Sequence, residues 1–191
     1  MDLLETYSEA AAGETMKPDL KDLRIIHYPD PRLRKVSERV TEFDGELKAL
    51  VARMLTLLEA DKGVGLAAPQ VGINKQLIVM SPSGQPGDTR VLVNPAIHDP
   101  HGSAEAEEGC LSLPGINVQV RRAQRCRVTA QDLDGRPIEQ VLEDLPARIC
   151  QHETDHLNGV LIIDRMGPTD RIATRRTLKA LEDSYKSRSA R

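Results

Sequence analysis

Aromatic residues are almost missing from this chain of 191 residues, which has no Trp, one Phe and three Tyr. A core must therefore be built from aliphatic side chains. The hydrophobic content of 39% is enough for one sizeable core of this kind. The sequence shows no internal repeat and no sign of a second folded domain, so we expect a single globular unit.

The N-terminal segment lacks the features of a targeting signal. The start MDLLETYSEA is acidic and contains no basic stretch followed by an apolar run. A secretion signal needs such a pattern, and an organelle import peptide is rich in arginine. We therefore expect a cytoplasmic protein with no membrane partner and no DNA partner.

Cysteine is also scarce, with three residues in the chain. An odd number without scaffold-like spacing argues against a disulfide-stapled fold and favours a reducing compartment. Cys126 falls in an expected strand and Cys150 in an expected helix, so both are predicted to be core residues. Cys110 stands instead between a glycine and a nearby proline, in a segment of constrained backbone.

Residues 151–157 carry the strongest chemical signal, with the sequence QHETDHL. On a helix, residues four apart share a face, so His152 and His156 can reach one metal ion. Glu153 is offset by one position and would lean over the open coordination site. The pattern predicts a site that activates water, although three specified residues can also occur by chance on a solvated helix.

The flanks of this segment favour a helix. Asp144 is placed to cap its start, and Pro146 suits its first turn. Leu145 and Ile149 lie on one stripe with the two histidines. The Asn-Gly pair at residues 158–159 would end the helix.

A catalytic metal site needs a third protein ligand, because the helix supplies two and the fourth position is kept for water. Cys110 is the best candidate. It lies in the segment EEGCLSLPG at residues 107–115. Taken alone, Cys110 is better interpreted as a small buried hydrophobic residue, and only the histidine pattern reverses that interpretation.

A third segment, at residues 63–72, reads GVGLAAPQVG. Its glycines let the backbone approach a ligand closely, and Gln70 can donate from its amide. The segment lacks the spacing of a dinucleotide-binding or phosphate-binding loop. Alone, it is typical of a glycine-rich turn between a helix and a strand.

Together, GVGLAAPQ, EEGCLSLPG and QHETDHL resemble, in this order, the three signature motifs of the peptide deformylase family. The similarity runs from about Leu23 to Met166. The family removes the formyl group from N-formylmethionine on nascent chains in bacteria and organelles and releases formate. The resemblance therefore implies a hydrolase with one divalent metal ion, commonly Fe²⁺, which Zn²⁺, Ni²⁺ or Co²⁺ can replace on purification.

The resemblance also implies a role for each matching position. Hydroxide held at the metal would attack the formyl carbon, with Glu153 as general base and acid. The Gln70 amide and the backbone N–H of Leu111 would stabilise the oxyanion. The backbone of Gly65 would pair with the peptide substrate. The metal ligands would be Cys110, His152 and His156.

An apolar pocket for the methionine side chain would be lined by Val64, Leu111 and Ile149. Behind the cysteine segment, Glu108 and Arg122 resemble a family ion pair that would orient the ligands. Plain solvent exposure of these two charged residues is an equally good interpretation of the sequence.

Three positions depart from the family pattern. Asn117 stands where many bacterial relatives carry an arginine that helps to bind the peptide. Arg148 lies beside Ile149, where some relatives have an aliphatic residue, and Ile162 stands where an aromatic residue is common. For Asp155, inside the motif, we expect solvation or a helix-side hydrogen bond rather than catalysis.

We expect an α+β fold, with mixed or antiparallel sheets packed around a central helix that carries the metal ligands. Apolar residues recur at helical spacing between about 44 and 60. The sequence LDGR at residues 133–136 signals a hairpin. Strands are expected at residues 76–80, 90–94, 118–122, 125–130 and 137–142.

The chain is expected to have three parts, namely a mobile leader (1–20), a catalytic body (21–169) and a basic C-terminal helix or tail (170–191). The tail has seven Lys or Arg and three Asp or Glu, whereas the rest of the chain has 19 and 26. Its basic residues are either a plain solvated face or, as in some bacterial deformylases, a contact with ribosomal RNA. An apolar stripe would dock the tail on the body through Ile172, Leu178, Leu181 and Tyr185.

Two other functions stay open from the sequence. A peptidase with the same histidine pattern would need another ligand after the helix; no His follows His156, but Asp164 and Glu182 are available. A metal-binding homologue without turnover would act through the basic tail. The deformylase is favoured because one chain retains Gln70, Cys110, His152, Glu153 and His156.

Overall fold

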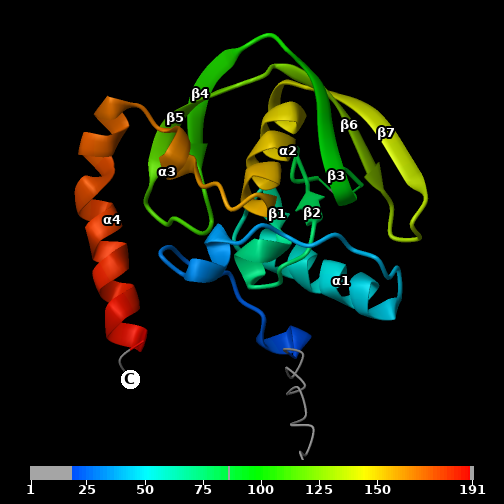
Figure 1. Cartoon of the computed structure of the whole chain (residues 1–191), viewed down its shortest axis with the longest axis horizontal. Helices are drawn as coiled ribbons and strands as arrows, with labels where there is room; N and C mark the ends of the chain where they lie inside the picture. Colours follow the sequence, from blue (N-terminus) through cyan, green and yellow to red (C-terminus); the bar gives the residue numbers. More distant parts are fainter. Residues whose placement is uncertain (1–18, 86, 190–191) are drawn as a thin grey trace, which may run out of the picture.

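The computed structural model describes residues 19–85 and 87–189, and within them the expected α+β fold is confirmed. A five-stranded sheet and a separate two-stranded hairpin arch over one helix, α2 (Asp144–Leu157), as Figure 1 shows. All pairings between these strands are antiparallel. The sheet has the order β1 (Gly65–Ala67), β2 (Leu77–Met80), β3 (Arg90–His101), β6 (Arg125–Gln131) and β7 (Pro137–Glu143), and the hairpin consists of β4 (Ala104–Gly109) and β5 (Asn117–Arg122).

The helix predicted at about 44–60 is present as α1 (Gly45–Ala60). Asp44 caps it, because its side chain accepts a hydrogen bond from the backbone N–H of Leu47. Met54 is fully buried, and the apolar face of α1 packs against residues of β1 and β2. These contacts anchor the glycine-rich segment that leads into β1.

The start of α2 differs from the prediction that Asp144 caps it. β7 runs into the helix without a loop, so Asp144 is the first helical residue and takes a φ of 51°. Its backbone N–H donates to the carbonyl of Gln124 (2.7 Å), and the preceding residue Glu143 makes no side-chain cap. The end agrees with the prediction, since Asn158 follows the helix and Gly159 has a φ of 70°.

The five predicted strands are confirmed as β2, β3, β5, β6 and β7, and the turn at residues 133–136 joins β6 to β7. The sequence does not predict β1, because three residues inside a glycine-rich segment are too few to show alternation. It does not predict β4 either, since Ala and Glu have low strand propensity; full pairing with β5 holds this strand. β3 extends to His101, beyond its predicted end at residue 94.

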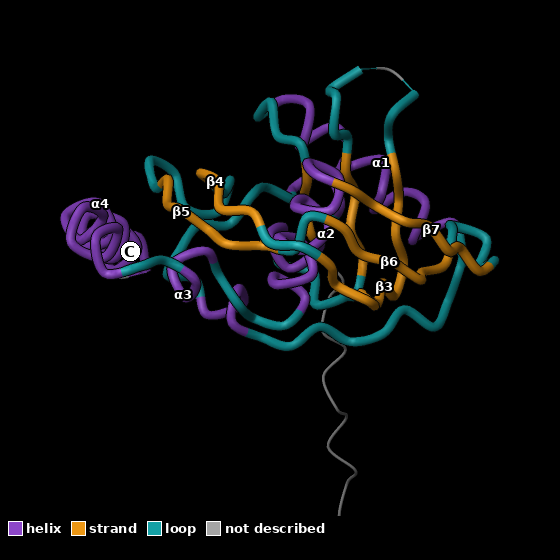
Figure 2. Tube along the Cα trace, turned by 90° about the horizontal axis from the view of Figure 1, so that it is seen from above, coloured by secondary structure: helices purple, strands orange, loops and turns teal. Residues whose placement is uncertain are grey.

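The C-terminal helix α4 (Pro168–Ser189) lies at one side of the molecule, next to the hairpin, in both views (Figures 1 and 2). Thr174 is buried, and Leu178 and Leu181 pack against a cluster that includes β5. The prediction that Ile172 belongs to the docking stripe is wrong, because its side chain is 80% exposed. Ile172 lies two positions before Thr174, which on a helix is about 200° around the axis.

The core is aliphatic, as expected. One cluster lies between α1 and the first strands, a second between α2 and the five-stranded sheet, and a third joins β5, α3 (Ile162–Arg165) and α4. Cys126 and Cys150 are fully buried in the second cluster, which confirms the prediction that both are core residues. Burial raises the pKa of the Cys150 thiol to about 12, so this thiol stays protonated.

The leader predicted at residues 1–20 falls almost wholly outside the described residues. Of these positions, Asp19 and Leu20 are described, and Leu20 begins the short 3-10 helix η1 (Leu20–Asp22). In the two described ranges, no helix combines the length and the apolar character needed to cross a membrane.

Candidate metal centre

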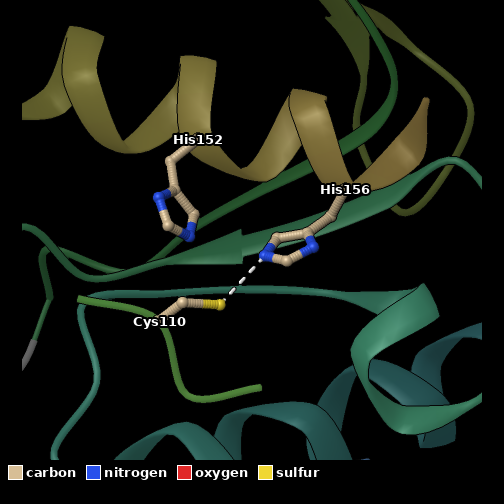
Figure 3. Close-up of side chains that lie close together, drawn as sticks. All are labelled: Cys110, His152 and His156. Atoms are coloured by element: carbon tan, nitrogen blue, oxygen red, sulfur yellow. Dashed lines mark hydrogen bonds between the residues drawn. The ribbon is translucent and has the colours of Figure 1, made fainter. Parts of the chain in front are cut away.

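The cysteine and the two histidines of the sequence motifs lie together beside α2 (Figure 3). His152 and His156 project from one face of the helix, and their ring centres are 5.1 Å apart. Cys110 comes directly after β4, and its Sγ lies 3.3 Å from Nε2 of His156. The ligand atoms of the three residues all lie within 4.8 Å of one another. Folding therefore brings two distant segments of the sequence to one point.

This donor set fits a divalent transition-metal ion. Tetrahedral sites hold nitrogen and sulfur at about 2.0 to 2.3 Å from the metal, which places the ligand atoms about 3.3 to 3.7 Å from each other. The distance of 3.3 Å between Cys110 Sγ and His156 Nε2 falls in this range. One thiolate and two imidazoles also leave a fourth position open, as catalytic sites require.

A buried carboxylate orients His152. Oε2 of Glu108 lies 2.9 Å from Nδ1 of His152, which leaves Nε2 as the nitrogen available to a metal. Arg122 donates to both oxygens of Glu108, at 2.7 and 2.9 Å. Burial opposes ionisation of Glu108, but the hydrogen bonds from Arg122 and His152 outweigh it and lower the pKa to about 2. The ion pair predicted between Glu108 and Arg122 is therefore present and buried, and the alternative that both residues are solvent-exposed is wrong.

Two further residues belong to this network, although the sequence did not assign them to it. Arg148 donates to the same carboxylate through Nη1 (2.7 Å). Asp155 accepts from Nη1 of Arg122 (2.8 Å) and also pairs with Arg165. The expected solvation or helix-side hydrogen bond of Asp155 is thus replaced by ion pairs. Arg148 lies four residues before His152 and Asp155 three residues after it, so both share its face of the helix. This spacing is the sequence signal that could have indicated their part in the network.

Glu153 is buried beside the ligands. It is 3% exposed, and its Oε2 has no hydrogen-bond partner among the described residues. Burial raises its pKa to about 7, against the attraction of His152 and Arg122. A Cβ at Gly65 would lie 2.4 Å from Oε1 of Glu153 and 2.7 Å from Cγ2 of Ile149, so any other residue there would displace these side chains. A carboxyl group with this pKa is suited to take up and return a proton.

The amide of Gln70 has a fixed orientation. Its Oε1 accepts from the backbone N–H of Ala67 (2.8 Å), which turns Nε2 toward the site. Nε2 lies 3.6 Å from Sγ of Cys110 and 3.3 Å from Oγ of Ser112. Gln70 therefore presents an oriented donor beside the sulfur of Cys110. The sequence does not predict the contact of Ser112 with Gln70, because a serine in a turn carries no specific sequence signal.

An open cavity of about 370 Å³ lies at this site, and its wall includes Gln70, Cys110, His152 and Glu153. The three residues predicted for the apolar pocket, Val64, Leu111 and Ile149, all line it. Arg148 is also in the wall, with its charged end bound to Glu108. A larger cavity of about 520 Å³ lies beside α1 and contains none of the predicted site residues.

Asn117, the departure from the family pattern, lies at the first position of β5 and is not in the cavity wall. Its Nδ2 donates to Oε1 of Glu107 (3.4 Å). A Cβ at Gly109 would lie 2.8 Å from Oδ1 of Asn117, so this side chain covers the backbone next to Cys110.

The acids that a peptidase site would need are engaged elsewhere. Asp164 pairs with Arg34 and accepts from the backbone N–H of Leu161 (2.7 Å). Glu182 accepts from the hydroxyl of Tyr28 (2.9 Å). Neither joins the ligand cluster found in the described part of the chain.

Comparisons with known proteins point to one family. The family model described as polypeptide deformylase matches residues 22–172. Peptide deformylase 1B, chloroplastic/mitochondrial, of Arabidopsis thaliana is 45% identical over 172 residues, which cover 87% of this chain and 62% of the plant protein. A peptide deformylase of Chromobacterium violaceum is 42% identical over 160 residues, covering 84% of this chain and 96% of that protein. The solved peptide deformylase of Plasmodium falciparum is similar with a TM-score of 0.84 and 39% identity, over 86% of this chain and 98% of the other.

Proposed function

Because this chain belongs to the peptide deformylase family, we propose that it removes the formyl group from the N-terminal formylmethionine of nascent polypeptides and releases formate. The observation that carries the proposal is the convergence of Cys110, His152 and His156 beside the buried Glu153. A chance match on a solvated helix would not bury this glutamate and both histidines. All three signature segments contribute to one cavity.

The chain's own residues account for the proton transfers. Cys110, His152 and His156 would hold the metal, which when bound supplies a water molecule with a pKa of about 7 instead of 15.7. Glu153 would take a proton from this water as the formyl carbon is attacked. Because its pKa is raised to about 7, Glu153 can then return the proton to the methionine nitrogen as the C–N bond breaks. The products are formate and a free amino terminus.

The charge that gathers on the formyl oxygen needs donors that are already oriented. Gln70 Nε2 is one, because Ala67 holds the other end of its amide. We propose the backbone N–H of Leu111 as the second, and within the described residues this N–H makes no hydrogen bond. Loss of one such donor typically raises the barrier by about 2.7 to 4 kcal/mol.

The cavity suits an extended peptide. β1 is an edge of the five-stranded sheet, and β4 pairs with β5 alone, so each has an unpaired edge in the described fold. Both strands line the cavity, and a peptide between them could pair with the backbone of Gly65. The methionine side chain would occupy the apolar part of the wall, formed by Val64, Leu111 and Ile149.

We propose ferrous iron as the native ion, with zinc, nickel or cobalt able to replace it. A thiolate and two imidazoles accept all four ions, so cellular supply and oxidation decide which is bound. The three cysteines are free thiols, which supports a reducing compartment, and we propose the cytoplasm.

We also propose that residues 21–169 form the catalytic body and that residues 170–191 contact ribosomal RNA. α4 docks through Leu178 and Leu181, which leaves its other face to solvent. Phosphate contacts need only exposed positive charge. The exposed basic residues near the start of this helix are Arg171, Arg175 and Arg176.

Formate release from a short formyl-Met peptide tests the proposed function. Protein purified without oxygen is loaded separately with Fe²⁺, Ni²⁺ or Zn²⁺, and the same peptide without the formyl group controls for cleavage. We expect formate, no internal cleavage, and the highest rate with Fe²⁺. Cleavage of the control peptide would support a peptidase instead, and metal binding without either reaction would support a non-catalytic homologue.

A further inference from the structure

The metal ligands come from two separate parts of the fold. His152 and His156 are on α2, whereas Cys110 follows β4 in the hairpin of β4 and β5. This hairpin is not part of the five-stranded sheet on which α2 packs. The distance between the cysteine and the histidines therefore depends on the contacts that fix the hairpin to α2.

Arg148 reaches from α2 to both strands of the hairpin. Its Nη1 donates to Oε1 of Glu108 on β4 (2.7 Å) and to the carbonyl of Val120 on β5 (2.9 Å). Its Nη2 donates to the carbonyl of Ala104 at the start of β4 (2.7 Å). The side chain is 14% exposed, so these bonds are largely shielded from water. One guanidinium group thus joins a helix to two strands.

Further ion pairs between α2 and the hairpin meet at the same place. Glu108 is shared by Arg148, Arg122 and His152. Arg122 in turn pairs with Asp155 on α2. On the helix, Arg148 lies one turn before His152 and Asp155 nearly one turn after it. The hairpin is therefore bound to α2 on both sides of a metal ligand.

We infer that Arg148 is a positioning residue that sets the separation between Cys110 and the two histidines. The inference rests on the proposed metal centre. Two nitrogens of a planar group donate to three oxygen atoms in fixed directions, which a lysine ammonium cannot reproduce. The long side chain next to Ile149 is accordingly used to hold the hairpin rather than to fill the proposed methionine pocket.

Cobalt binding by three variants tests this inference. Arg148→Met removes all three hydrogen bonds. Arg148→Lys keeps a positive charge near Glu108 but lacks the two guanidinium nitrogens that donate in fixed directions. Arg53→Met is the matched control, because Arg53 also donates to backbone carbonyls, those of Leu23 (2.7 Å) and Lys21 (3.3 Å), but does not line the cavity. Each protein is titrated with Co²⁺ against a competing chelator, and the thiolate-to-cobalt absorption is recorded at saturation.

We expect Arg148→Met to bind Co²⁺ about 10- to 100-fold more weakly and to show an altered thiolate band, with Arg148→Lys between it and the wild type. Arg53→Met should lose thermal stability but bind Co²⁺ as the wild type does. If Arg148→Met does not fold, Arg148→Lys and Arg148→Gln provide the same comparison.

Equal affinity and an equal band in the Arg148 variants and the wild type would overturn the inference and leave the metal centre intact. An equal loss of affinity in Arg53→Met would also overturn it, since affinity would then follow stability. Absence of a thiolate band in the wild type would overturn the metal centre and the inference together.

Discussion

At the scale of single residues, the site contains two buried glutamates with opposite properties. Burial opposes ionisation of Glu108, but its hydrogen bonds with Arg122 and His152 lower its pKa to about 2. Glu153 is equally buried, but its Oε2 has no partner among the described residues, and its pKa is raised to about 7. The neighbours therefore keep one carboxylate ionised beside His152 and leave the other able to take up a proton near pH 7, as the proposed role of Glu153 requires.

Substitution of Glu153 and Cys110 should separate catalysis from metal binding. Glu153→Ala should retain the metal but lose about 10²- to 10⁴-fold in turnover, because only the proton carrier is removed. Cys110→Ala should lose both, because a ligand is removed. Metal content by elemental analysis and formate release measure the two effects. Wild-type activity in either variant would contradict the proposed roles.

Gly65 should be intolerant of a side chain, because its Cβ would meet Oε1 of Glu153 at 2.4 Å. Gly65→Ala should therefore displace the carboxylate and reduce kcat by about 100-fold, the effect of a misplacement of about 1 Å. Gly45→Ala is the control, since nothing lies within 4 Å of a Cβ there. Steady-state formate release compares the two variants, and an unchanged kcat in Gly65→Ala would show that Glu153 can move without cost.

At the scale of elements, the helical pattern of α2 placed His152, Glu153 and His156 correctly relative to one another, because helix geometry is local. The helical pattern did not predict the start of α2 correctly, because the strand before the helix decides the conformation of Asp144. Sequence patterns also failed for β4, because a strand of Ala and Glu is specified by its partner β5. Local patterns predicted elements with a strong periodicity and missed those that depend on pairing.

The end of α2 should be sensitive to substitution of Gly159. Its φ is 70°, and a Cβ would lie 2.5 Å from the carbonyl oxygen of Arg34, a backbone atom with little room to move. Gly159→Ala should destabilise the fold by at least about 1 to 2 kcal/mol, which is the cost of the left-handed conformation alone. The clash with the carbonyl oxygen of Arg34 adds to this cost. Gly167→Ala, where a Cβ would meet nothing within 4 Å, should have little effect. Urea unfolding of both variants measures the difference, and equal stability would contradict the role of Gly159.

At the scale of the whole molecule, the hairpin with α4 forms one side and the five-stranded sheet with α1 the other, and α2 runs between them (Figure 1). The cavity opens between β1 and β4, one strand from each side. The exposed basic face of α4 lies outside this cavity. Substrate binding and contact with RNA would therefore use different surfaces.

The proposed ribosome contact should depend on charge and not on the docking of α4. Replacing Arg171, Arg175 and Arg176 with Gln should weaken binding to ribosomes and lower its salt dependence, because fewer phosphates are neutralised. Activity on a short formyl-Met peptide should not change. Sedimentation with ribosomes at several salt concentrations measures this, and unchanged binding at every salt concentration would contradict the proposal.

The sequence by itself determined which chemical groups are available for the proposed reaction. The three motifs contain the proposed donor atoms, the proposed general base and the amide of Gln70, and the helical repeat puts both histidines on one face, since these features depend only on nearby residues. The tertiary structure decided how far Cys110 lies from the histidines, that Arg148 and Asp155 hold the hairpin, and that Ile172 faces solvent. These features depend on contacts between residues far apart in the chain, and a periodic pattern contains no information about which distant surface an element will meet.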